Sequence, residues 1–253
     1  MNYAKLRFLL LMSSFIALLP SCSDSNSGWS PTNSGSDITG TEAENKSIDK
    51  KLFEVINLDY PGLGKVKTYY EAGEYYLAAQ SLLNYYRIRT DVVNPLISLL
   101  NVTVTANEKK IADDALSYKF YVKNYTDAKG ESYQFKAGSD TQINWAYQPV
   151  TDGEFRSELY RLAWFDEQGK AYRATGNESY VKSWIEVYGD FWSQYPIPTT
   201  NTYDHYGTYG ALPVAERVIE ASDVFSYFIN SSNFTPAWLS TFLTSVAEQV
   251  EYI

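Results

Sequence analysis

The sequence predicts an all-α fold built from antiparallel helix hairpins. Three observations predict it. Apolar residues recur at steps of three and four, glycines punctuate the helical stretches at Gly73 and Gly176, and residues 48–253 contain no sustained strand alternation. The hairpins are irregularly spaced, and no repeat of about 34 residues recurs, as it would in a tetratricopeptide array. We therefore expect the hairpins to wind into a partial, incomplete α/α toroid.

Composition sets limits on the class of protein. The chain has 253 residues, of which 45% are hydrophobic, so it is long enough to bury a core. Its formal net charge of -9 argues against nucleic acid or a polyanion held by bulk charge, although a local basic groove stays open. Aromatic residues make up 16% of the chain, which is typical of helical sugar-binding proteins and equally of helix-packed cores.

The first 21 residues have the layout of a secretory signal. Lys5 and Arg7 precede an apolar run over residues 8–19, which is shorter than a membrane-spanning helix. The run ends in Leu-Pro-Ser before Cys22, and this order resembles the lipobox of bacterial lipoproteins. We expect Cys22 to carry a lipid that anchors the protein at the bacterial cell envelope, on the periplasmic or the outer-membrane surface. The alternative is an ordinary cleaved signal with an incidental cysteine.

A flexible tether and a folded body follow the signal. Residues 22–47 are rich in Ser, Gly, Asn, Thr and Asp and carry almost no large apolar side chain, which predicts a flexible tether. Residues 48–253 form the predicted toroid portion. Because Cys22 is the only cysteine, an internal disulfide framework and a cysteine-based metal site are both excluded.

The first predicted hairpin surrounds Gly73. Asp59 and Pro61 are suited to open a short helix that stops near Gly73, and a second helix covers residues 74–89. Further along, Asn107 is placed to cap a polar helix that ends near residue 118. Residues 120–139 show no sustained period, and we expect a long surface loop there.

The second predicted hairpin surrounds Gly176. One helix is expected over residues 154–175, with Gly176 in the left-handed position just past its end and Asn177 capping the next helix. That next helix, ending near residue 195, is apolar on more than one side and should contact neighbours on both flanks. Two further helices are expected, over residues 211–229 and from Pro236 onward, with Thr235 as the cap of the last one.

Residues 52–90 read LFEVINLDYPGLGKVKTYYEAGEYYLAAQSLLNYYRIRT, and their order of features resembles the N-terminal region of the heparinase II/III polysaccharide lyases. The resemblance covers most of residues 52–217. It continues in short elements, which are Ile143-Asn144-Trp145, the helix with Glu158, Leu159 and Arg161, the run Lys170-Ala171-Tyr172, and Glu216-Arg217. One departure is Tyr209-Gly210, where the family usually has a tryptophan nearby.

The resemblance implies an incomplete α/α toroid followed by β-sandwich material, and β-elimination of an acidic polysaccharide such as heparan sulfate. Removing the C5 proton of a uronate needs a base, a group that neutralises the adjacent carboxylate, and an acid for the leaving oxygen. The family supplies these with Asn, Tyr and His residues located mostly after the matched region. We therefore expect the catalytic residues to lie beyond Ile253, on a separate or missing C-terminal portion, and the chain alone to be inactive. No cofactor is implied.

Four residues are candidates for binding the polysaccharide. Trp145 and Tyr147 could stack on sugar rings, and the alternative is a packed aromatic staple. Arg161 and Arg217, with Arg156 near the first of them, could bind uronate or sulfate groups bidentately. For both arginines the alternative is an ion pair, because each has a glutamate close by in the sequence.

The only histidine, His205, is a candidate base because imidazole titrates near neutrality, and the alternative is a solvated loop residue. Asp204 beside it has no second histidine or carboxylate at ligand spacing, so no metal site is predicted. A second class of function also stays open. The chain could be a non-catalytic helical lipoprotein that binds a glycan or serves as a scaffold.

Overall fold

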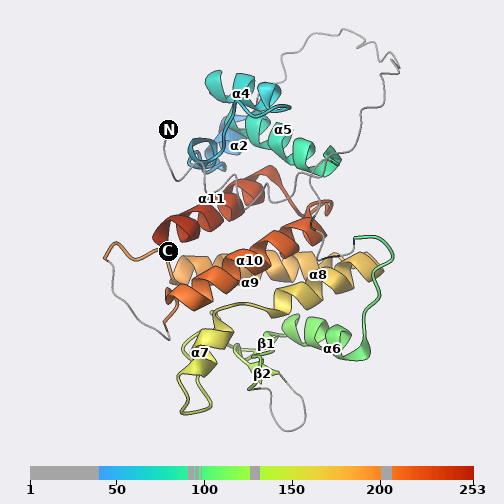
Figure 1. Cartoon of the computed structure of the whole chain (residues 1–253), viewed down its shortest axis with the longest axis vertical. Coiled ribbons are helices and arrows are strands. Elements are labelled where there is room, and N and C mark those ends of the chain that lie inside the picture. The colour runs from blue at the N-terminus through green and yellow to red at the C-terminus, as the bar shows by residue number, and fades with distance from the viewer. Residues whose placement is uncertain (1–39, 91–93, 95–96, 98, 126–131, 201–206) are drawn as a thin grey trace.

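The computed structural model describes residues 40–90, 94, 97, 99–125, 132–200 and 207–253, and these residues are predominantly helical (Figure 1). The predicted all-α class is confirmed. Cys22 and His205 lie outside the described residues. The helices are α2 (Glu42–Lys46), α3 (Leu52–Val55), α4 (Gly64–Glu71), α5 (Tyr75–Ile88), α6 (Ala106–Ala115), α7 (Glu154–Leu159), α8 (Trp164–Thr175), α9 (Ser179–Gln194), α10 (Ala211–Phe228) and α11 (Pro236–Tyr252).

The hairpin predicted around Gly73 is formed by α4 and α5. Gly73 has a φ of 79°, a left-handed conformation that glycine adopts without steric cost. The buried side of α5 packs against α11. Arg87, at the end of α5, donates to the carbonyl oxygens of Ile229 and Ser231, each at 2.8 Å. These bonds tie the first hairpin to the turn between α10 and α11.

The predicted tether does not extend through its last residues. Residues 42–46 form α2, which begins at a capping box in which the Thr41 hydroxyl accepts from the Glu44 backbone N–H and the Glu44 carboxylate accepts from Thr41. Asn45 then accepts from the backbone N–H of Tyr76 at 2.9 Å. The polar residues of this segment therefore cap α2 and contact α5. Low hydrophobicity alone does not reveal these two roles.

The polar helix predicted near residue 107 is α6, but its cap differs from the prediction. Thr105 is the N-cap and forms a capping box with Glu108, so Asn107 falls inside the first turn. Residues within the loop predicted over 120–139 also pair. Strand β1 (Lys119–Phe120) lies antiparallel to β2 (Tyr133–Gln134), which makes a minimal two-stranded ladder.

The single helix predicted over residues 154–175 is two helices. The chain turns between α7 and α8 at Leu162, which has a φ of 59° and is 1% exposed. A left-handed leucine costs about 1–2 kcal/mol. Two features of the turn offset that cost. The turn buries the Leu162 side chain, and it leaves the Tyr160 carbonyl free to accept a hydrogen bond from Arg217 at 2.7 Å. No glycine or proline marks this break in the sequence.

The hairpin predicted around Gly176 is formed by α8 and α9. Gly176 has a φ of 69°, and the Asn177 side chain accepts from the Ser179 N–H at 3.1 Å, as the sequence predicts. Rings on α9 are buried on several sides. Trp184 lies between 5.1 and 5.6 Å, centroid to centroid, from four aromatic rings of the α10–α11 region, which are Phe228, Phe234, Trp238 and Phe242.

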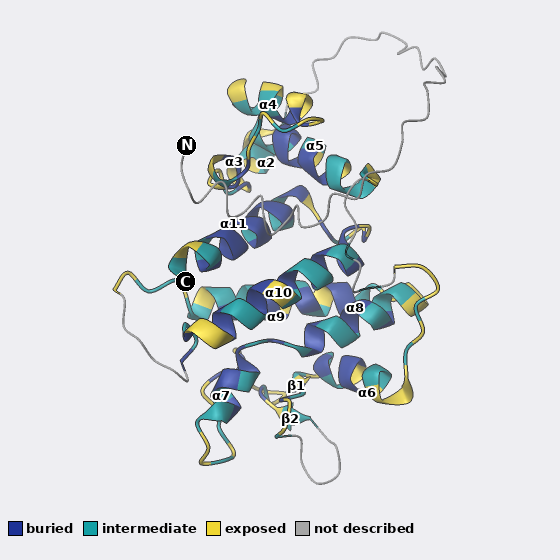
Figure 2. Ribbon diagram, in the orientation of Figure 1, coloured by how far each residue is buried: buried dark blue, intermediate teal, exposed yellow. Residues whose placement is uncertain are grey.

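Helix α10 packs against α8 and α11 and lies in front of α9 in the view of Figure 1. Gly169 allows a close approach between α8 and α10, since a Cβ there would lie 2.4 Å from the Tyr227 ring. Helix α11 begins as predicted, with Thr235 as cap and Pro236 in its first turn, and its central residues are buried (Figure 2). Among the described helices, none is both long and apolar enough to cross a membrane.

Candidate functional site

Trp145 lies in a buried aromatic stack with rings of β1, α8 and α9. Its ring is 5.5 Å from Phe120, which in turn stacks on Trp164 at 4.4 Å and 3°. Phe191 from α9 packs edge-on against Trp145 at 5.1 Å. The Trp145 side chain is 1% exposed, so neither of its faces is available to a sugar ring. The packed aromatic alternative describes this residue.

The polar edge of Trp145 is also occupied. Its indole Nε1 donates to the Asp190 carboxylate at 2.7 Å, and Gln194 Nε2 donates to the same oxygen at 2.7 Å. Asp190 stands on α9 one helical turn before Gln194, so the pair orients the indole from one helix face. Asp190 was not among the predicted residues, although a carboxylate inside an aromatic-rich helix is a signal of a buried partner.

Tyr147 is the candidate that reaches the surface. It is 38% exposed, and its ring packs edge-on against Phe135 at 5.6 Å. A half-exposed tyrosine fixed on one side keeps the other side free for a ligand. Tyr147 therefore has the placement that stacking on a sugar requires, whereas Trp145, two residues earlier, does not.

Arg161 forms the ion pair that its spacing suggests. Its Nη1 lies 3.0 Å from Glu158 Oε1, and the two side chains are 16% and 10% exposed. Burial raises the pKa of Glu158, while the Arg161 charge opposes that rise. The Nε groups of Arg161 and Arg156 are buried and make no hydrogen bond to any residue that the structure describes. Two guanidinium groups near α7 thus keep unused donors.

Arg217 is buried in the core of α10, with 2% of its surface exposed. It donates to three neutral oxygens, namely Gln249 Oε1 at 2.5 Å, the Tyr160 carbonyl at 2.7 Å and the Thr208 carbonyl at 3.2 Å. Its guanidinium also lies 5.1 Å from the Phe191 ring centroid. Burial lowers the pKa of Arg217 to about 10, so the group stays charged at neutral pH. It holds three segments together and does not face solvent.

Tyr160 connects the candidates that the sequence places far apart. Its hydroxyl donates to the Trp145 carbonyl at 3.4 Å, and its own carbonyl accepts from Arg217. Its ring lies 6.1 Å from Phe191, the ring that also contacts Trp145 and Arg217. Trp145 and Arg217 therefore belong to one buried network, while Tyr147 and Arg161 lie nearer the surface. No motif or spacing in the sequence marks Tyr160 as a member of this network.

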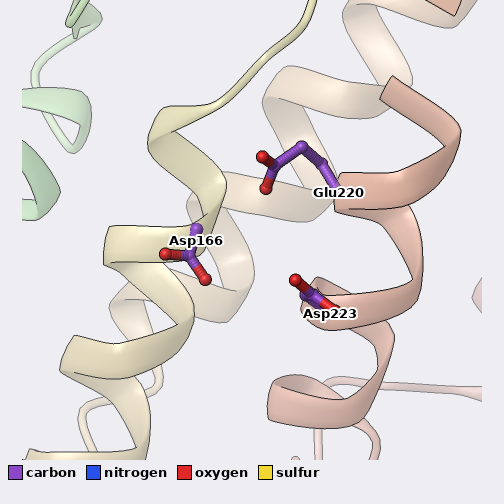
Figure 3. Close-up of side chains that lie close together, drawn as sticks. All are labelled: Asp166, Glu220 and Asp223. Carbon is purple, nitrogen blue, oxygen red and sulfur yellow. The ribbon is translucent and has the colours of Figure 1, made fainter. Parts of the chain in front are cut away.

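A cluster of carboxylates between α8 and α10 was not predicted (Figure 3). Asp166, Glu220 and Asp223 each place a carboxylate oxygen within 4.8 Å of the others. Lys170 compensates part of this charge, because its Nζ lies 2.6 Å from Asp166. Burial, then repulsion from Asp166, raises the pKa of Glu220 to about 7. Such oxygens suit hard cations, but the separation of Asp166 from the other two in sequence hides the cluster.

Two open pockets lie away from these residues. One, of about 480 Å³, is lined by side chains from the α3, α9 and α11 ends, including Lys51, Trp192 and Tyr252. The other, of about 580 Å³, lies beside the two-stranded ladder and is lined by residues that include Tyr118, Gln134 and Lys136. Neither pocket contains Trp145, Tyr147, Arg161 or Arg217, so neither brings the sequence candidates together.

The sequence and the fold of the chain both match known proteins. Residues 52–253 match the model of the Heparinase II/III N-terminus family. The chain belongs to this family. It is 44% identical over 219 residues to a heparin-sulfate lyase of Bacteroides thetaiotaomicron, and 36% identical over 214 residues to one of Pedobacter heparinus. These matches cover 86% and 83% of this chain, respectively.

The solved structures confirm the architecture of this family member. A crystal structure of heparinase III superposes with a TM-score of 0.75 at 45% identity, covering 81% of this chain and 31% of the other. A heparan sulfate lyase from Pedobacter heparinus superposes with a TM-score of 0.68 at 31% identity. The N-terminal domain of heparinase III is an α/α toroid, so the predicted toroid is confirmed. The chain spans about a third of the length of the lyases it matches, 31% and 32% for the two curated relatives above.

Proposed function

We propose that this chain is the N-terminal toroid portion of a lyase that cleaves a uronic-acid-containing acidic polysaccharide by β-elimination. The observation that carries the proposal is the 44% identity to a heparin-sulfate lyase, sustained over 86% of this chain. The aligned part is about a third of that lyase. We further propose that the residues that transfer protons come from the part of such a lyase that lies outside the matched third.

The surface near α7 supports a role in holding the polysaccharide. Arg156 and Arg161 place guanidinium groups beside α7, where Arg161 also pairs with Glu158, and Tyr147 is 38% exposed. Guanidinium groups bind carboxylate and sulfate through paired N–H donors, and an exposed ring packs on the apolar face of a sugar. The net charge of -9 requires that such binding be local, because the rest of the chain repels a polyanion.

The catalytic part of the proposal is tested by mixing the purified chain with heparan sulfate and following the ultraviolet absorbance of the unsaturated uronate product. We expect no product from the chain alone, because a uronate elimination needs a base, an acid and a carboxylate-neutralising group together. Steady product formation, reduced in His205→Ala, would overturn the assignment of proton transfer to another portion.

The binding part is tested separately, by calorimetric titration of heparan sulfate into the chain. We expect Tyr147→Ala combined with Arg161→Gln to weaken binding at least tenfold, which corresponds to about 1.4 kcal/mol. Lys182→Gln, on the exposed side of α9, is the matched control and should leave binding unchanged. Equal weakening by the control would point to bulk electrostatics. Binding without turnover in every assay would favour the non-catalytic glycan-binding alternative.

We also propose that the chain is held at the bacterial cell envelope by a lipid on Cys22. The support is the order of charged, apolar and small residues before Cys22 in the sequence. A single acyl chain gives marginal membrane binding and stable anchoring takes more than one chain, so the proposed attachment is a multiply acylated cysteine.

A further inference from the structure

Arg156 on α7 differs from the other arginines that the structure describes. It is half-buried, and it makes no hydrogen bond, ion pair or ring contact with any described residue. Its Nε is buried, whereas its two Nη groups are not among the buried atoms and therefore reach solvent. Each of the other described arginines contacts a carbonyl oxygen, a carboxylate or an aromatic ring, and these are Arg87, Arg89, Arg161, Arg173 and Arg217.

Helical spacing offers Arg156 one carboxylate, and that carboxylate is already engaged. Asp152 stands four residues before Arg156, which is a separation at which ion pairs form on a helix surface. Its Oδ2 accepts from the Tyr125 hydroxyl at 2.6 Å, and its Oδ1 accepts from the Glu154 backbone N–H at 3.0 Å. These bonds hold Asp152 at the start of α7, so the charge of Arg156 has no counter-ion among the described residues.

Arg161, the second arginine beside α7, is in a different electrostatic setting. Its Nη1 lies 3.0 Å from Glu158 Oε1. The charges of Glu154 and Glu216 also act on the Glu158 carboxylate, with Lys123 opposing them. An anion that approaches Arg161 must therefore compete with Glu158 for the guanidinium, in a region that already holds two more carboxylates. The two arginines beside α7 are not equivalent as anion-binding groups.

The surroundings of Arg156 are aromatic. Burial raises the pKa of Tyr160, and the nearby Arg156 charge opposes that rise. Tyr195 and Thr208 also act on the Tyr160 hydroxyl, and neither carries a charge at neutral pH. The Tyr195 ring lies 5.8 Å from the Tyr160 ring, centroid to centroid. An anion on this side of α7 therefore meets neutral side chains, whereas beside Arg161 it meets carboxylates.

The loop that carries Tyr147 is fastened to both ends of α7. Gln148 Nε2 donates to the Asp152 carbonyl at 3.0 Å, just before the helix. Tyr160, the C-cap of α7, donates from its hydroxyl to the Trp145 carbonyl at 3.4 Å. The exposed tyrosine ring and the unpaired guanidinium therefore belong to one local unit. This combination suits a sugar ring and its acidic group, whereas the core of a contact between protein segments is depleted of charged residues.

We propose that Arg156 binds the anionic group of the polysaccharide, a uronate carboxylate or a sulfate, and that Arg161 serves the fold through its ion pair with Glu158. The Nη groups of Arg156 donate to two oxygens of the ligand, because its Nε is buried. The inference rests on the proposed function, since it names the residue that holds the ligand there. The loss expected from Tyr147→Ala with Arg161→Gln then comes mainly from Tyr147.

The test compares two matched variants of the full chain, Arg156→Gln and Arg161→Gln, by calorimetric titration with heparan sulfate and by urea unfolding. We expect Arg156→Gln to weaken binding about tenfold or more and to keep the urea midpoint of the parent, because the group has no protein partner. We expect Arg161→Gln to weaken binding less than about threefold and to lower the midpoint, because Glu158 loses its partner. Arg156→Lys keeps the charge without the forked donors and should recover part of the lost affinity.

Heparan sulfate from which the sulfates have been removed identifies the anionic group. An effect of Arg156→Gln that persists on the desulfated polymer supports the proposal with a uronate carboxylate as the ligand group, and an effect confined to the sulfated polymer supports it with a sulfate. Unchanged binding in Arg156→Gln, or an equal loss in the two variants, would overturn the inference and leave the proposed function standing. A parent chain that does not bind heparan sulfate would overturn both.

Discussion

Arg217 shows how one residue can fix several segments. It lies on α10 and donates to the carbonyl oxygens of Tyr160 and Thr208 and to the side chain of Gln249 on α11. A buried charge is tolerated only when its donors are used, and here they are used by neutral oxygens. The resemblance to a lyase family pointed to Arg217 as a ligand-binding residue, but its surroundings make it a structural one.

Replacing Arg217 tests that role. Arg217→Met keeps most of the side-chain volume but strands three buried acceptors, so we expect the free energy of unfolding to fall by about 3 kcal/mol. Urea unfolding followed by circular dichroism measures it. Lys182→Met, at an exposed position of α9, is the control and should change the value by less than about 0.5 kcal/mol. A stable Arg217→Met that has lost only glycan binding would restore the binding role.

The carboxylate cluster gives a pH dependence of stability. Burial and four neighbouring carboxylates, from α8 and α10, raise the pKa of Glu220 from 4.5 to about 7, and Lys170 pairs with Asp166 beside them. The folded state thus binds this proton more tightly than the unfolded state. The resulting stabilisation is complete below about pH 4.5 and is lost as the pH rises through about 7.

The variant Glu220→Gln removes this dependence. At pH 8 we expect it to raise the free energy of unfolding by about 1 to 2 kcal/mol, a value discounted for the partial exposure of the group. At pH 4.5 the variant and the parent should be nearly equal. Urea unfolding at the two pH values measures the difference. The exposed Glu251→Gln on α11 is the control, and an equal response from it would argue against the cluster as the cause.

At the scale of elements, the contact between α8 and α10 depends on a missing side chain. A Cβ at Gly169 would lie 2.4 Å from the Tyr227 ring, and Tyr227 is 2% exposed and unable to move away freely. Gly169 follows Phe165 by four residues and precedes Tyr172 by three, which places it on the packing face of its helix. The contact between Gly169 and a tyrosine of α10 could not be inferred from the sequence, because the whole of α9 separates α8 from α10 along the chain.

Two glycine substitutions make a matched pair. Gly169→Ala should lower the free energy of unfolding by about 1–3 kcal/mol through overpacking, despite the better helix propensity of alanine. Gly189→Ala on α9 meets only Trp238, at 3.8 Å, and should raise stability by roughly 0.5–1 kcal/mol. Thermal unfolding of both variants checks the pair. A Gly169→Ala variant more stable than the parent would show that α8 and α10 can move apart without a loss of stability.

At the scale of the whole molecule, the chain separates its charged surfaces. Guanidinium groups lie beside α7, whereas a cluster of carboxylates lies between α8 and α10. A chain with a net charge of -9 cannot attract a polyanion by its total charge. We therefore expect an acidic glycan to bind beside α7 and to avoid the carboxylates between α8 and α10.

The proposed anchor is also a property of the whole molecule. In a bacterial host that processes lipoproteins, we expect the parent chain to partition with membranes and to incorporate labelled fatty acid. Cys22→Ser should lose both, because no other cysteine is present to accept the lipid. Fractionation with radiolabelled palmitate measures the change. Retention of Cys22→Ser on membranes would show that attachment depends on something other than this cysteine.

The sequence alone determined the helical class, the hairpins at Gly73 and Gly176, the entry of α11 at Thr235 and Pro236, and the family. These are local features, because caps, left-handed glycines and apolar spacing are written within a few residues of one another. The helix spacing predicted the break at Gly176 and failed at Leu162, where the turn depends on Arg217, distant in sequence.

Only the tertiary structure decided which side chains are buried and which meet. Trp145 and Tyr147 are two residues apart and look alike in sequence, yet the first is a core residue and the second is half exposed. Asp166, Glu220 and Asp223 form one cluster only because α8 and α10 pack together. The physical reason is that burial and proximity depend on contacts between segments that are distant in sequence. The local pattern of residues does not show which segments make those contacts.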